Sequence, residues 1–75
     1  MNEIEREIKK RKIKVEFMNK KINYITKFLN ENDIDYEVKV WESGEGKEII
    51  IGNVVIEFSV GGYVGFKTKQ ELENE

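Results

Sequence analysis

The chain has no cysteine and no histidine among its 75 residues. Their absence excludes disulfide bonds, thiolate zinc sites, cysteine and histidine nucleophiles and imidazole general bases. Long apolar runs are also missing. No stretch approaches the 18 or so residues of a membrane-spanning helix, and the charged N-terminus lacks the apolar region of a secretory signal. We therefore expect a cytoplasmic protein without membrane contact.

The length of 75 residues predicts a single domain, residues 1–75. Such a chain buries about 60% of its surface on folding, so its core is thin unless a partner or a second copy adds area. The net charge of −2 hides a split, because residues 1–30 carry nine Lys or Arg and four Glu. Residues 31–75 carry four Lys and eleven Asp or Glu, so a basic half is joined to an acidic half.

Residues 1–30 have the pattern of an amphipathic helix with a heptad seam. Seven of the eight a and d positions are apolar, the seam being Ile4, Ile8, Arg11, Val15, Met18, Ile22, Ile25 and Leu29. A second apolar group, formed by Ile13, Phe17, Tyr24 and Phe28, lies roughly opposite the seam, so the helix needs two partners. One is the sheet, and the other could be the same helix of a second copy in a homodimer. Because residues 12–17 alternate charged and apolar, a helix, strand and second helix remain an alternative.

Residues 34–68 alternate apolar and polar side chains in short runs, which predicts an antiparallel meander. The expected strands are 34–40, 48–51, 54–60 and 63–68, with a loop at 42–47 and two-residue turns at Gly52-Asn53 and Gly61-Gly62. Residues 69–75 form a polar tail. The predicted fold is α+β, a long N-terminal amphipathic helix packed on one face of a three- or four-stranded antiparallel β-meander.

The two tight turns predict the register, and therefore which side chains share a face. Ile51 is expected opposite Val54 and Val60 opposite Tyr63. The predicted core face consists of Tyr36, Val38, Val40, Ile49, Ile51, Val54, Ile56, Phe58, Val60 and Tyr63. The opposite face combines apolar side chains with acids, which predicts a partner-binding patch of Trp41, Ile50, Val55, Val64, Phe66, Glu37, Glu48 and Glu57. Trp41, at a strand end beside an acidic loop, is either a partly buried anchor or a binding hot spot, since tryptophan is the residue type most enriched at hot spots.

Other charged clusters suggest chemistry of a different kind. The basic run of Lys9, Lys10, Arg11, Lys12 and Lys14 indicates a solvated helix face or a phosphate-binding surface. A membrane-surface helix is a weaker alternative, because the seam contains no Trp or Phe. Five carboxylates are candidate ligands for Mg²⁺ or Ca²⁺, namely Asp33, Asp35, Glu37, Glu48 and Glu57. The domain is too thin to close a pocket, and Ser43 and Ser59 have no base to activate them. We therefore expect no enzyme activity, no catalytic residue, no metal and no cofactor.

The expected function is that of a non-enzymatic protein-binding module, an inhibitor or adaptor that acts through the acidic, partly apolar sheet face. In size and charge the chain is similar to phage-type anti-restriction and anti-CRISPR inhibitors. That similarity implies an acidic inhibitor of a nucleic-acid-processing enzyme. The alternative is a nucleic-acid-binding protein that uses the basic N-terminal helix.

Overall fold

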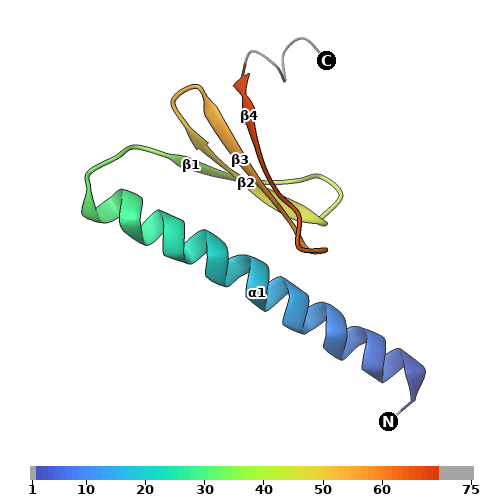
Figure 1. The fold of residues 1–75 in the computed structure, drawn as a ribbon. Coiled ribbons are helices and arrows are strands. Elements are labelled where there is room, and N and C mark those ends of the chain that lie inside the picture. The colour runs from blue at the N-terminus through green and yellow to red at the C-terminus, as the bar shows by residue number, and fades with distance from the viewer. Residues whose placement is uncertain (1, 70–75) are drawn as a thin grey trace.

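The computed structural model describes residues 2–69, which form one long helix and one four-stranded sheet (Figure 1). The elements are α1 (Glu3–Glu31), β1 (Glu37–Val40), β2 (Gly46–Ile51), β3 (Val54–Ser59) and β4 (Val64–Thr68). Neighbouring strands are antiparallel, in the order β1-β2-β3-β4, and α1 packs on one face of the sheet. The predicted α+β fold is confirmed. The predicted tail lies outside the described residues, apart from Lys69.

Helix α1 is continuous over 29 residues, so the alternative with a strand at 12–17 is wrong. The heptad seam continues through residues 12–17. The charged residues of this segment are exposed to solvent on a helix just as they would be on a strand, so their alternation does not require a strand. The side chain of Asn2 caps the first turn, because its Oδ1 accepts a hydrogen bond from the amide of Glu5 at 2.9 Å. At the other end, Asn32 donates to the Phe28 carbonyl and Asp33 adopts a left-handed φ of 54°, which turns the chain toward β1.

The core lies between the C-terminal half of α1 and the two central strands. Its buried members are Met18, Ile22, Leu29, Ile49, Ile56, Phe58 and Val60, with Val15, Ile25, Tyr36 and Ile51 packed against them. The heptad seam therefore faces the sheet from Val15 onward, and that part of it is not a dimer seam. The first seam residues, Ile4 and Ile8, extend beyond the sheet and are 71% and 65% exposed.

The N-terminal half of α1 projects from the sheet as an arm (Figure 1). A helix of 29 residues is about 44 Å long, whereas strands of four to six residues span about 13–20 Å. The overhang gives the chain a radius of gyration of 14.5 Å, where a compact chain of this length has about 11 Å.

The turn at Gly52-Asn53 has the predicted register, with Ile51 opposite Val54. Gly52 has a φ of 56°, as the first central position of a tight hairpin requires.

The turn at Gly61-Gly62 differs from the prediction by one residue. Phe58 pairs with Val64, so the expected pairing of Val60 with Tyr63 is wrong. The amide of Val60 donates instead to the Glu45 carbonyl at 2.8 Å, which draws Val60 out of the ladder. The hydroxyl of Ser59 accepts the amide of Tyr63 at 2.9 Å and closes a three-residue loop.

This shift moves every β4 side chain to the other face of the sheet. Val64, Phe66 and Thr68 lie on the helix side, opposite Phe58, Ile56 and Val54 respectively. Tyr63 lies on the outer face, where its ring covers Gly65, so it does not belong to the core face. The predicted outer patch therefore loses Val64 and Phe66, two of its five apolar members.

Candidate functional site

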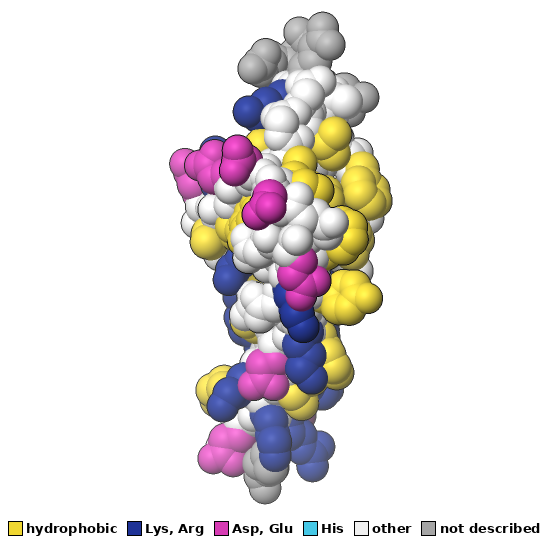
Figure 2. All heavy atoms as spheres, turned by 90° about the vertical axis from the view of Figure 1, so that its left-hand side faces the viewer, with side chains coloured by type: hydrophobic (Ala, Val, Ile, Leu, Met, Phe, Trp, Pro, Cys, Tyr) yellow, Lys and Arg dark blue, Asp and Glu magenta, His cyan; other side chains and the backbone are white. Residues whose placement is uncertain are grey.

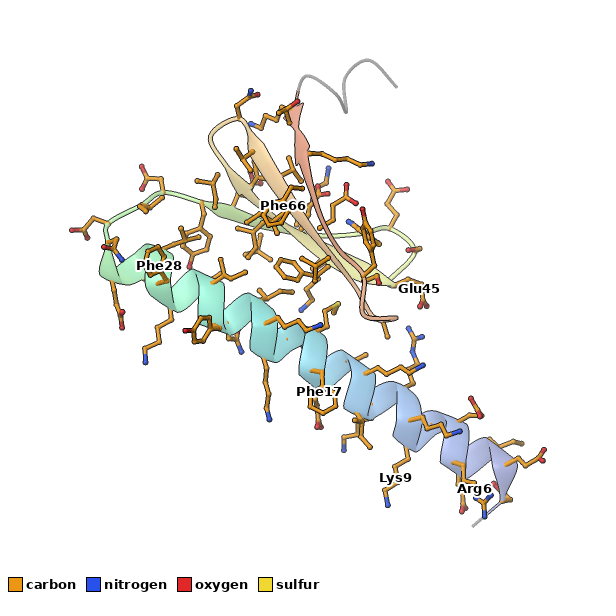
Figure 3. The ribbon with its side chains drawn as sticks, viewed as in Figure 1. Arg6, Lys9, Phe17, Phe28, Glu45 and Phe66 are labelled. Carbon is orange, nitrogen blue, oxygen red and sulfur yellow. The ribbon has the colours of Figure 1, made fainter. Side chains whose placement is uncertain are left out.

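A line of large apolar side chains runs along α1 and remains exposed in the folded chain. Ile13, Phe17, Tyr24 and Phe28, here called the helix stripe, are 46%, 57%, 80% and 57% exposed. Their spacings of four, seven and four residues keep them on one side of the helix, away from the sheet-facing seam. In Figure 3 the Phe17 ring points away from the sheet. The sequence identified this second apolar group, and within residues 2–69 none of its four side chains is buried against another element.

A second exposed group lies on the helix side of the sheet, at its β4 edge. Val54, Val64 and Phe66, here called the sheet patch, are 43%, 42% and 71% exposed. One helix is about 10 Å wide and a four-stranded sheet about 19 Å, so α1 cannot cover the whole face. The uncovered β1 edge shows the same effect, since Val38 and Val40 are also exposed. The sheet patch was not predicted, because the expected β4 register placed Val64 and Phe66 on the outer face.

A shallow groove joins the helix stripe to the sheet patch. It has a volume of about 470 Å³ and is lined by Lys20, Lys21, Tyr24, Ile25, Phe58 and Val64. Its floor and walls are apolar, and the two lysines border it. Figure 2 shows hydrophobic side chains gathered along one side of the molecule, over both the sheet and the helix.

The outer face of the sheet is more closed than the sequence predicted. Val55 is 1% exposed, and Trp41 and Ile50 are half-buried. The Trp41 ring lies across Gly46, where a Cβ atom would come within 2.5 Å of it. Trp41 therefore serves as an internal cover of this face, and the remaining apolar side chains offer little exposed area.

Two acids of the outer face, Glu48 and Glu57, have polar partners on that face. Glu48 and Glu57 are direct cross-strand neighbours, which is an unfavourable like-charge arrangement. Glu48 accepts a long hydrogen bond of 3.4 Å from Trp41 Nε1, and Glu57 lies 3.5 Å from Lys67 Nζ. Glu37, at the β1 edge, is exposed. The outer face thus carries a partly neutralised polar network.

The basic run lies on the projecting arm of α1. Arg11 occupies the point where the helix leaves the sheet and forms a bidentate pair with Glu45, at 2.9 and 3.2 Å. Lys10 lies 3.9 Å from Glu7. Within residues 2–69, Lys9, Lys12 and Lys14 have no ion-pair partner and point to solvent on different sides of the helix.

The pair of Arg11 and Glu45 ties the arm to the loop before β2. Its hydrogen bonds, reinforced by the opposite charges, hold the pKa of Glu45 below its ordinary value and raise that of Arg11. Both groups are solvent-exposed, so salt screens their attraction. The arginine that interrupted the predicted seam is therefore exposed and paired, and creates no buried charge.

No group of three acidic side chains converges to hold a metal ion within the described part of the chain. The candidate ligands are spread over the connection between α1 and β1 and over three strands, namely Asp33, Asp35, Glu37, Glu48 and Glu57. No helix in residues 2–69 combines the length and apolar character needed to cross a membrane.

A comparison with protein-family models finds no match, and comparisons with curated proteins and with solved structures find none either.

Proposed function

We propose that the protein is a non-enzymatic protein-binding module, an adaptor or inhibitor, that captures its partner on the helix side of the fold. The observation that carries this proposal is the helix stripe. Four large apolar side chains lie in one line, each at least 46% exposed, and the members of the sheet patch are each at least 42% exposed. Contiguous apolar surface of this kind is typical of protein interaction sites.

The location differs from the acidic outer face expected from the sequence. There Val55 is buried, and Val64 and Phe66 point to the other side. Trp41 is half-buried and packed on Gly46, in agreement with the partly buried anchor that was one of its two predicted roles. The helix side offers exposed aromatic rings, which contribute large contact area at interfaces.

The test is affinity capture from an extract of the source organism, followed by mass spectrometry, with three tagged versions of the chain. These are the wild type, a Phe17→Asp/Phe66→Asp variant of the helix side, and a Glu37→Lys variant of the outer face as the matched surface control. All three should remain folded, and the helix-side variant should lose only the few degrees expected when partly covered side chains are replaced. We expect the helix-side variant alone to lose the partner. Equal capture by all three would refute the proposal.

A nucleic-acid-binding function is the second candidate, supported by the projecting arm. Lys9, Lys12 and Lys14 are exposed there and lie apart from the acidic sheet. Binding of a labelled 20-base-pair DNA or RNA should then be measurable at 50 mM salt and fall steeply by 200 mM. Substituting these three lysines by glutamine should abolish it. No binding at 50 mM salt would rule this function out.

A further inference from the structure

We infer that the partner element is an acidic amphipathic helix, seated between α1 and the β4 edge of the sheet. The inference rests on the proposed function and adds the chemistry of the occupant. It follows from three features of the groove: its shape, its lining and its charge.

The shape of the groove fits a helix. Its wall is formed by Tyr24 and Ile25 of α1, and its floor by Phe58 and Val64. A second helix packs beside a first at about 8–10 Å between axes, which places it over the β4 edge that α1 leaves uncovered. The helix stripe from Ile13 to Phe28 covers 15 helical steps, or about 22 Å, enough to line four turns of a partner. In Figure 3 Phe66 lies over the sheet above this region.

The charge around the groove selects an acidic occupant. The described lining contains two lysines, Lys20 and Lys21, and no acid. Helical geometry places Lys20 and Lys27 on one flank of the helix stripe, and Lys10, Lys14 and Lys21 on the other. Two acids lie nearby: Glu31 borders the C-terminal end of the stripe, beside Phe28, and Glu16 lies one turn before Lys20 on the first flank. Glutamates on both flanks of an incoming apolar face would therefore meet lysines.

The same charges disfavour a homodimer through this surface. Two copies meeting stripe to stripe would bring lysine-rich flanks together, and like charges at an interface reduce its stability. The seam that first suggested a dimer is already occupied by the sheet from Val15 to Leu29. A second copy is thus a poorer occupant than a chain of opposite charge.

Two synthetic 18-residue peptides provide the test. Both carry leucine at the same helical positions, and the remaining positions are mainly glutamate in one peptide and lysine in the other. Fluorescence anisotropy at 50 mM and 500 mM NaCl measures their binding to the full chain. We expect the acidic peptide to bind, with an affinity that falls several-fold at the higher salt, and the basic peptide not to bind.

Two double variants locate the site. Lys20→Glu/Lys21→Glu reverses the charge at the groove. This variant should reduce the affinity for the acidic peptide at least about tenfold and should allow the basic peptide to bind. Lys12→Glu/Lys39→Glu makes the same charge change away from both flanks of the helix stripe, on another side of α1 and on β1, and should alter the affinity less than about twofold. Equal weakening by both variants, or equal binding of both peptides by the wild type, would overturn the inference.

Two further measurements separate the other occupants. Sedimentation velocity that shows a dimer lost on Phe17→Asp would assign the surface to a second copy and overturn the acidic helix. Wild-type binding to vesicles of phosphatidylserine, without binding to the acidic peptide, would assign it to an anionic membrane. If neither peptide binds but capture from the extract still depends on Phe17 and Phe66, the inference of an acidic helix is refuted. The proposed protein-binding function is then retained.

Discussion

Phe58 and Phe66 allow a direct test of which face of the sheet is free for a partner. Both side chains lie on the helix side of the sheet, Phe58 on β3 and Phe66 on the adjacent strand β4. Phe58 is 2% exposed, whereas Phe66 is 71% exposed. Truncating each to alanine removes the same atoms from two very different environments. The difference between the two losses of stability therefore measures burial and no other property of the ring.

The expected magnitudes differ several-fold. Phe58→Ala removes a fully packed ring, and such changes cost about 3–5 kcal/mol. For a domain of this size each kcal/mol lowers the melting temperature by about 4–8 °C, so the loss is about 12–40 °C. Phe66 has less than a third of its surface covered. Its truncation should cost about 0.4–0.9 kcal/mol, scaled from the 1.5–3 kcal/mol of full burial, or about 2–7 °C.

Urea denaturation followed by circular dichroism and tryptophan fluorescence gives these numbers. Trp41 is the only tryptophan, and its ring lies on the opposite face of the sheet, so neither substitution touches the probe. Phe58→Leu is the milder variant if Phe58→Ala does not fold. An equal loss of stability for Phe66→Ala and Phe58→Ala would show that Phe66 is buried in solution. The sheet patch would then not be available to a partner.

Two further predictions concern the sheet and the arm. A Cβ at Gly46 would lie 2.5 Å from both the Trp41 ring and a backbone oxygen, so Gly46→Ala should cost about 1–3 kcal/mol by urea denaturation. Gly65→Ala meets only the movable Tyr63 ring, and an equal loss there would contradict this reasoning. Arg11 lowers the pKa of Glu45 below its ordinary value of 4.5. The ion pair therefore contributes its full stabilisation at pH values above 4.5, and this stabilisation is lost as the pH falls through the depressed pKa. Thermal melts from pH 7 to pH 3 should show a larger decrease for the wild type than for Glu45→Gln, and parallel decreases would exclude the contribution.

The sequence predicted the parts of the fold that depend on local pattern. The seam of α1 and the alternation in β2 and β3 were sufficient to predict a helix and two strands. Each periodic pattern continues for enough residues to distinguish a helix from a strand. The turn at Gly52-Asn53 was predicted correctly because its register depends only on its own two residues. The segment at 12–17, in which both periodicities were present, took the conformation of the longer pattern around it.

The errors arose where distant residues decide the local structure. The register of β4 depends on the hydrogen bond between the Val60 amide and the Glu45 carbonyl, which are 15 positions apart. Arg11 appeared misplaced in an apolar seam because its partner, Glu45, lies 34 positions away. Neither contact has a signal in a single sequence. The placement of Phe66, and with it the location of the exposed surface, could therefore be read only from the structure.

The distribution of apolar side chains argues for a partner more strongly than any one of them does. Within residues 2–69, eight hydrophobic side chains are buried and thirteen large ones are exposed. A single helix on a four-stranded sheet has too little area to cover more, since its width is about half that of the sheet. The high charge content of 37% keeps such a surface in solution, and the lysines among it surround the helix stripe. An occupant that covers the helix stripe and the sheet patch would extend the core across the β4 edge, so bound partner should raise the melting temperature of the chain in proportion to the logarithm of its concentration.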